Sequence, residues 1–194
     1  MPPNPLSSMP VLVAGGGIGG IAAALALVRR GFRVKVLEQA AQLGEIGAGL
    51  QVGPNGFAAF DALGVGTVAR SRAVYTDAMV MHDALDEYLV GYIPTGTAFR
   101  ERFGNPYAVI HRADAHSALL EGARASDQIE VLTATKVQRV EQDDNTVTVI
   151  DASGARHVGC ALIGADGVKS AIRRQFVGDE ARVSGHVVYR AVVD

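Results

Sequence analysis

The chain has 194 residues, of which 48% are hydrophobic and 20% are charged, so it can bury a substantial core in one or two domains. Its formal net charge of −2 argues against nucleic acid or a membrane surface as a partner. Its one cysteine, Cys160, excludes an intrachain disulfide framework and suits the cytoplasm, and the longest apolar run, residues 21–28, is too short to span a bilayer.

A glycine-rich turn separates the first predicted strand, residues 10–14, from a predicted helix over 18–30. Gly15 allows the sharp turn, Gly17 lets a ligand approach the backbone, and Gly20 lets the helix pack closely on the strand. The first N–H groups of such a helix lack internal partners and carry a positive partial charge. The turn therefore predicts a binding site for the diphosphate of a dinucleotide.

An acidic residue, Glu38, ends the second predicted strand, residues 33–37. A carboxylate about 20 residues after the glycine turn is where a dinucleotide-binding unit holds the adenosine ribose. The alternative is an ordinary surface glutamate beside a tight strand-to-helix turn.

Residues 44–56 hold five glycines in thirteen positions, which makes this stretch costly to order. Two interpretations stay open. The backbone can lie against a flat ligand, or the stretch can form a β-ribbon with bulges. Pro54 then opens a helix over 57–63, which Gly64 ends.

The middle of the chain interrupts the strand–helix alternation. Residues 74–81 and 88–93 predict a hairpin, and 94–105 predict a polar loop. A short extended segment over 106–110 and a helix over 113–125 follow.

A strand is predicted over 129–132. The strands 136–142 and 147–151 and the segment 156–160 follow, and they predict an antiparallel meander over 136–158, spliced between parallel strands. It favours a flavin-type fold over a plain NAD-linked dehydrogenase, because a doubly wound NAD domain normally continues with helices. A buried parallel strand over 161–165, a helix over 171–176 and a last strand over 183–193 complete the prediction. Because the chain stops inside that strand at Asp194, we expect it to be truncated.

Asp166 and Gly167 directly follow the predicted parallel strand. Asp166 can contact a ligand, or it can form an Asx-turn or cap the next helix, and the two roles are compatible. The histidines lack the spacing of a metal site, so none is expected.

With these residues in view, the chain resembles the N-terminal part of the FAD-dependent aromatic hydroxylases, the class A flavoprotein monooxygenases. Three motifs carry the resemblance: the glycine turn with Glu38, the segment 47–55, and residues 163–170 followed by Arg173. Segments 99–112 and 185–194 look most like those of 3-hydroxybenzoate 6-hydroxylases. Salicylate hydroxylases and 6-hydroxynicotinate 3-monooxygenases are the nearest alternatives.

The resemblance implies an α/β, glutathione-reductase-like FAD-binding fold: a parallel sheet with helices, an antiparallel meander, and part of a substrate-domain sheet. It assigns residues 1–73 and 104–182 to the FAD-binding domain, and 74–103 and 183–194 to a fragment of the substrate-binding sheet. The family's later Gly-Asp motif would lie beyond Asp194, so we expect the 194 residues alone to be inactive.

The resemblance also implies roles for single residues. Glu38 would hold the ribose, and Arg112 would contact FAD near its ribityl and phosphate groups. Gln51 would lie near the flavin, Val137 would offer backbone to the adenine side, and Asp166 would serve both FAD and NAD(P)H. Arg112 can instead pair with Asp114, and Val137 can be an ordinary apolar strand residue. No catalytic base is assigned.

The implied reaction is hydroxylation of a hydroxybenzoate, with 3-hydroxybenzoate converted to gentisate as the best guess. FAD would be reduced by NADH or NADPH and would react with O₂ through a C4a-hydroperoxide. The partners are a small aromatic acid and O₂, and a homodimer is one assembly that the sequence allows. Other interpretations are a salicylate or 6-hydroxynicotinate hydroxylase, another FAD oxidoreductase such as a halogenase or epoxidase, and an inactive FAD half-site.

Overall fold

The structure is a computed structural model that describes residues 9–44, 47 and 49–189. The predicted tail over 1–8, parts of the glycine-rich stretch (45, 46 and 48) and residues 190–194 of the last predicted strand lie outside the described residues. The chain divides into two compact units. The first unit comprises residues 1–45 and 119–194, and the second comprises residues 46–118.

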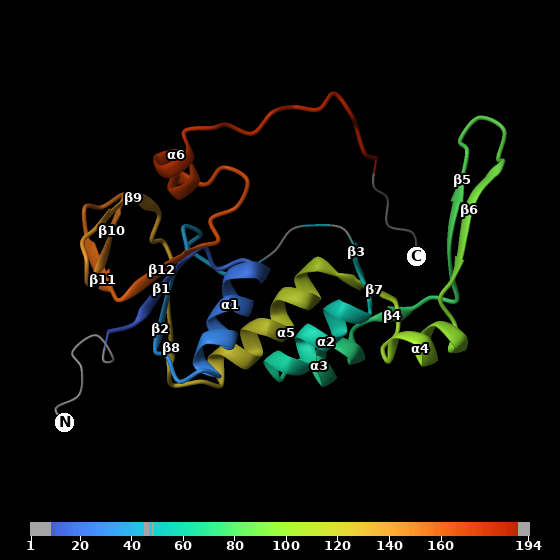
Figure 1. Cartoon of the computed structure of the whole chain (residues 1–194), viewed down its shortest axis with the longest axis horizontal. Helices are drawn as coiled ribbons and strands as arrows, with labels where there is room; N and C mark the ends of the chain where they lie inside the picture. The colour runs from blue at the N-terminus through green and yellow to red at the C-terminus, as the bar shows by residue number, and fades with distance from the viewer. Residues whose placement is uncertain (1–8, 45–46, 48, 190–194) are drawn as a thin grey trace. The chain divides into compact units, whose positions relative to one another are not determined.

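The first unit is built on a four-stranded parallel sheet in the order β12-β1-β2-β8 (Figure 1). Its strands are β1 (Val11–Ala14), β2 (Val34–Leu37), β8 (Ile129–Leu132) and β12 (Ala161–Gly164). All four β1 side chains are buried, as expected of a strand covered on both faces. The strand predicted over 161–165 is parallel to β1, but the expectation that it is buried was wrong, because β12 is a partly exposed edge strand.

Helix α1 (Ile18–Val28) packs against the strands of this sheet. It ends close to its predicted boundary, where Gly31 adopts a left-handed φ of 84°. A side chain is rarely tolerated in that conformation, so the glycine stops the helix and redirects the chain into β2.

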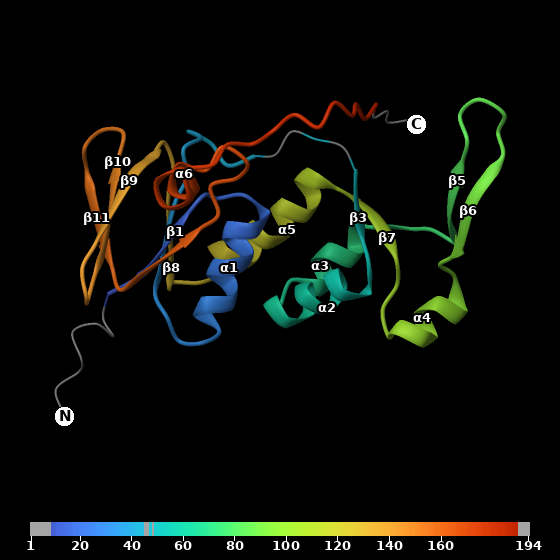
Figure 2. The ribbon, with the colours of Figure 1, turned by 45° about the horizontal axis from the view of Figure 1, so that its top comes forward.

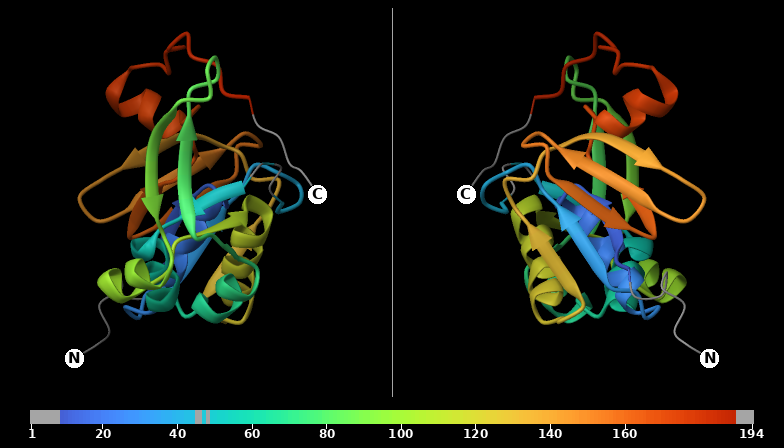
Figure 3. Two further views of the ribbon diagram at one scale, coloured as in Figure 1. Left: turned by 90° about the vertical axis from the view of Figure 1, so that its right-hand side faces the viewer. Right: turned by 90° about the vertical axis from the view of Figure 1, so that its left-hand side faces the viewer.

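The predicted antiparallel meander is confirmed as a three-stranded sheet in the order β11-β10-β9. Figure 3 shows it as a layer separate from the parallel strands. Its strands are β9 (Val137–Gln142), β10 (Val147–Asp151) and β11 (Arg156–Gly159). Val140 and Val149 pack in one core cluster with Leu12 and Leu37 of the parallel sheet, so the two sheets share a core.

Helix α6 (Ala171–Val177) is fixed to the meander by Gln175. The side-chain amide accepts a hydrogen bond from the Val140 N–H at 2.9 Å and donates one to the Val140 carbonyl at 2.6 Å. This pairing satisfies both polar groups of one backbone residue on β9.

The second unit contains the antiparallel sheet β3-β7-β4, formed by β3 (Gly49–Val52), β7 (Ala108–His111) and β4 (Val74–Tyr75). Helices α2 (Pro54–Leu63) and α3 (Gly66–Ser71) belong to this unit, and α2 packs on β3. The ribbon alternative for the glycine-rich stretch is thus correct for residues 49–52. Helix α5 (Arg112–Arg124) begins in the second unit and ends in the first.

Arg70 ties the elements of the second unit together. Its guanidinium pairs with the Asp61 carboxylate of α2, donates to the Asn105 side chain at 2.7 Å, and lies 5.0 Å from the centre of the buried Phe57 ring. The bond to Arg70 also holds the pKa of Asp61 below its usual range. One arginine therefore links α3, α2 and the segment that leads into β7.

The predicted hairpin consists of β5 (Ala78–His82) and β6 (Leu89–Pro94), drawn in Figure 2 as a two-stranded ribbon. Its first arm was predicted as one strand over 74–81, which was wrong in part, because residues 74–75 form β4 and pair with β7 instead. The polar loop predicted over 94–105 was wrong in part, because α4 (Thr97–Phe103) forms there. Gly96 and Gly104 flank this helix, and the rings of Phe99 and Phe103, one turn apart, lie 4.6 Å from centre to centre. Helix α3 was not predicted.

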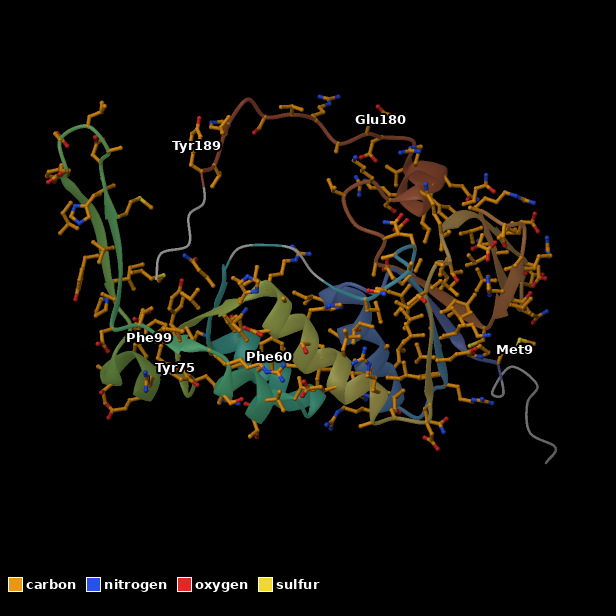
Figure 4. The ribbon with its side chains drawn as sticks, turned by 180° about the vertical axis from the view of Figure 1, so that it is seen from behind. Met9, Phe60, Tyr75, Phe99, Glu180 and Tyr189 are labelled. Carbon is orange, nitrogen blue, oxygen red and sulfur yellow. The ribbon has the colours of Figure 1, made fainter. Side chains whose placement is uncertain are left out.

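The strand predicted over 183–193 is absent from its described part, residues 183–189. Apolar alternation alone does not make a strand, because its backbone groups need a partner. Val183 and Tyr189 are 96% and 93% exposed, and Figure 4 shows Glu180 and Tyr189 along an irregular segment.

No helix among the described residues is long and apolar enough to cross a membrane. Within the same residues, no three histidine, cysteine or acidic side chains gather in a way that could hold a metal ion.

Candidate functional site: a backbone cradle at the ends of parallel strands

The glycine turn after β1 is shaped by close backbone contacts. Gly15 has a left-handed φ of 103°, and its N–H donates to the Leu37 carbonyl at 2.8 Å. A Cβ on Gly15 would overlap the carbonyl of Ala165, and a Cβ on Gly20 would overlap the carbonyl of Gly15. The roles predicted for these two glycines, a sharp turn and close helix packing, match this geometry.

Gly17 is the N-cap residue of α1, with φ −72° and ψ −176°. As a glycine it has no side chain with which to cap the helix. The amino end of α1 therefore presents backbone to whatever binds there, with the positive end of the helix dipole behind it.

The Glu38 carboxylate lies beside this turn. It accepts a hydrogen bond from the Gly16 N–H at 2.6 Å and another from the Ala40 N–H at 2.7 Å. The backbone of Glu38 is fixed as well, because its N–H donates to Leu132 and its carbonyl accepts from Thr135, both at 2.8 Å. An acid predicted from spacing alone is thus held at the carboxyl end of β2. It lies next to the glycine turn, residues 15–20, which we call the cradle.

The Asp166-Gly167 motif meets the same turn. The Ala165 N–H donates to the Ala14 carbonyl at 2.8 Å, which brings the end of β12 against the end of β1. The Asp166 carboxylate accepts from the Ser170 hydroxyl at 2.6 Å and from the Ala171 N–H at 2.8 Å. Of the two roles left open, Asp166 performs the capping one at the start of α6, and a contact with a ligand stays a prediction.

Val137 is the first residue of β9 and is 8% exposed. It lies two residues after Thr135, whose N–H donates to Glu38. Both earlier interpretations remain compatible with this placement, since a buried apolar side chain leaves backbone groups to contact a ligand.

Gln51 and Arg112 lie in the second unit. Gln51 is exposed on β3 opposite Val109 of β7. Arg112 is exposed at the start of α5, and its Cδ would lie 3.1 Å from a Cβ on Gly47. A glycine at position 47 therefore leaves space beside the Arg112 side chain. The nearby Asp114 takes part in a different contact, because its backbone carbonyl accepts a hydrogen bond from the Arg72 side chain at 3.4 Å.

Two further features of these regions emerge from the structure. Ser170 caps α6 by accepting from the Arg173 N–H at 2.9 Å, which its position just before an apolar helical run could have suggested. Tyr107 is 7% exposed, and its hydroxyl has no hydrogen-bond partner within the part of the chain that the structure describes. No sequence signal reports a missing partner, because that property depends on the packed structure.

Comparison with known proteins agrees with the geometry of the cradle. Residues 8–193 match the family described as FAD binding domain. The chain belongs to the FAD binding domain family. The glycine-rich turn and Glu38 fit the diphosphate and the ribose of such a cofactor, because the turn offers backbone N–H groups and Glu38 is an acceptor for hydroxyl groups.

Three curated relatives that match nearly the whole chain carry the name 3-hydroxybenzoate 6-hydroxylase. That of Polaromonas naphthalenivorans is 71% identical over 100% of this chain and 48% of its own length, and that of Klebsiella oxytoca is 52% identical over 96% and 47%. A third, from Aquipseudomonas alcaligenes, is 46% identical over 94% and 47%. The chain thus spans about half the length of the curated relatives it matches.

Solved structures show the same fold. Klebsiella pneumoniae HpxO, crystallised with FAD and uric acid, is 29% identical, with a TM-score of 0.72 over 89% of this chain and 43% of that one. The p-nitrophenol 4-monooxygenase PnpA of Pseudomonas putida has a TM-score of 0.74 over 85% of this chain and 42% of its own. The expected FAD-binding α/β fold is confirmed.

Proposed function

We propose that the whole protein, including any sequence outside these 194 residues, is an FAD-dependent monooxygenase that hydroxylates a hydroxybenzoate ring. The proposed reaction converts 3-hydroxybenzoate to 2,5-dihydroxybenzoate (gentisate). One observation carries the proposal: three relatives that share this name are 46% to 71% identical to nearly the whole chain.

The residues of the first unit are proposed to hold the adenosine half of the cofactor. The turn at Gly15, Gly17 and Gly20 receives the diphosphate against backbone N–H groups. Glu38 accepts hydrogen bonds from the ribose hydroxyls in addition to those from Gly16 and Ala40, since a carboxylate has about four acceptor sites. The backbone at Val137 lies on the adenine side.

The remaining cofactor residues have other proposed tasks. Asp166 fixes the loop before α6 and contacts FAD and NAD(P)H through that loop. In the second unit, Arg112 neutralises negative charge near the ribityl and phosphate groups, and Gln51 lies near the flavin. When bound, FAD supplies the redox chemistry, taking electrons from NADH or NADPH and activating O₂.

The test uses the whole recombinant protein. We expect a yellow protein with stoichiometric FAD that consumes NADH or NADPH faster when 3-hydroxybenzoate is added and releases 2,5-dihydroxybenzoate, identified by chromatography. Salicylate and 6-hydroxynicotinate test the related activities, and benzoate, which lacks the ring hydroxyl, is the control substrate. A colourless protein that takes up no FAD, or a flavoprotein that no phenolic acid stimulates, would contradict the proposal.

A further inference from the structure

One face of the β3–β7 sheet is open and the other is buried. Val52, Ala108 and Ile110 point into the core, while Gly49, Gln51 and His111 are exposed. The register places Gly49 opposite His111 and Gln51 opposite Val109. Side chains alternate along a strand, so the open face includes these four positions and the exposed Val74 of β4, which pairs with Val109. The glycine leaves part of this face without a side chain.

Tyr107 directly precedes β7 and differs from the residues around it. By the same alternation it falls on the side of Val109 and His111, yet it is 7% exposed, and its hydroxyl has no hydrogen-bond partner among the described residues. Burial raises the pKa of this phenol, so it stays a proton donor at neutral pH. A buried hydroxyl without a hydrogen-bond partner is energetically unfavourable, so we look for an acceptor on a ligand that binds during the protein's function.

The position of Tyr107 along the strand suggests which acceptor that is. Arg112, the proposed contact for the phosphate side of the cofactor, follows the other end of β7. At a rise of about 3.3 Å per residue, the two residues are separated by roughly 16 Å of extended chain. Tyr107 thus lies at the end of β7 away from the phosphate contact, with Gln51 opposite the strand between them.

We propose that the Tyr107 hydroxyl donates a hydrogen bond to an oxygen of the aromatic acid substrate, and so determines specificity for an oxygen-bearing ring. The inference rests on the proposed function, because it takes the substrate to be a hydroxybenzoate. The bond involves no proton transfer: the phenol keeps its proton, and the carboxylate or ring oxygen of the acid accepts.

The test compares Tyr107→Phe with wild type in the whole, FAD-loaded protein. The dissociation constant of 3-hydroxybenzoate, measured from the change in flavin absorbance, should rise about tenfold, as expected for one lost hydrogen bond to a charged group. FAD content should be unchanged. The melting temperature without substrate should be equal or higher, because Phe removes an unpaired buried hydroxyl, and a purely structural tyrosine would not give this combination.

Tyr75→Phe is the matched control, because Tyr75 lies on the same sheet and its hydroxyl already donates to the Arg70 carbonyl at 3.2 Å. It should leave substrate affinity unchanged. Tyr107→Phe protein with wild-type substrate affinity, reduced FAD content or a lower melting temperature would overturn the inference while the proposed function stands. Wild-type protein without FAD would overturn the proposed function itself.

Discussion

Gly20 occupies a position where backbone meets backbone. Because a Cβ there would overlap the Gly15 carbonyl, Gly20→Ala must separate α1 from the turn. We expect this overpacking to cost about 3 kcal/mol of stability and to displace the amino end of α1 from the cradle. The melting temperature of the chain and the FAD content of the whole protein should both be lower than in the wild type.

Gly19 provides the control for this prediction. It lies next to Gly20 in the same helix, but a Cβ on it would meet nothing within 4 Å. Gly19→Ala should therefore stabilise the protein by about 0.5–1 kcal/mol, since alanine favours helix more than glycine. If both variants were destabilised alike, the Gly20–Gly15 contact could not be the cause of the loss, because Gly19 makes no such contact.

Single residues were predictable to different degrees. Gly15, Gly20 and Glu38 could be found from the sequence because the strand–turn–helix–strand unit fixes their spacing, and local backbone geometry does the rest. The bonds of Asp166 within its own loop were foreseen as one of two roles. The unpaired hydroxyl of Tyr107 could not be predicted, since it depends on contacts between segments distant in the chain.

At the scale of elements, the turn between β10 and β11 is held by one carboxylate. Asp151 accepts from the Ser153 hydroxyl at 2.6 Å, the Ser153 N–H at 2.8 Å, the His157 ring at 2.9 Å and the Ala155 N–H at 3.1 Å. The bond from the Ser153 hydroxyl, followed by that from His157, holds the pKa of Asp151 well below its usual range.

This lowered pKa gives a stability change with a definite sign. The pKa of an aspartate in the unfolded chain is about 3.9. The stabilisation by Asp151 is therefore fully present above about pH 4, and it is lost as the pH falls through the lower pKa of the folded state. Asp151→Asn should melt at a lower temperature than wild type at pH 7, and the difference should shrink below about pH 4. Asp144→Asn, at an exposed position in the turn between β9 and β10, is the control, and a difference that stays constant with pH would contradict the assignment.

Elements with a continuous apolar pattern were predicted well, and the short helices α3 and α4 were not. The strands β8 and β10 coincide with their predicted ranges, because short apolar runs bounded by turn residues leave a clear pattern. Helices α3 and α4 have six and seven residues, too few for a periodic signal. The strand expected over 183–193 shows the opposite error, because its pattern is strand-like but residues 183–189 have no partner strand.

At the scale of the whole molecule, we expect elements of the two units to differ in their local stability. In the first, β1 is buried and paired on both sides. In the second, the hairpin β5–β6 exposes most of its side chains, and isolated two-stranded hairpins are marginally stable. Hydrogen exchange followed by mass spectrometry should find β1 among the slowest segments and β5–β6 among the fastest. Equal protection of the two would contradict this order.

The pairing of β1 with β12 also has a consequence for synthesis on the ribosome. β1 emerges before its partner on one side, β12, which lies about 150 residues later in the chain and pairs Val11 with Ala161. Until residues 161–165 emerge, the nascent chain carries an apolar strand with one unpaired edge and a glycine turn without the Ala165 carbonyl against it. The cradle therefore forms late in synthesis. The edge of β1 that later pairs with β12 is the place where a chaperone would bind or where early aggregation would begin.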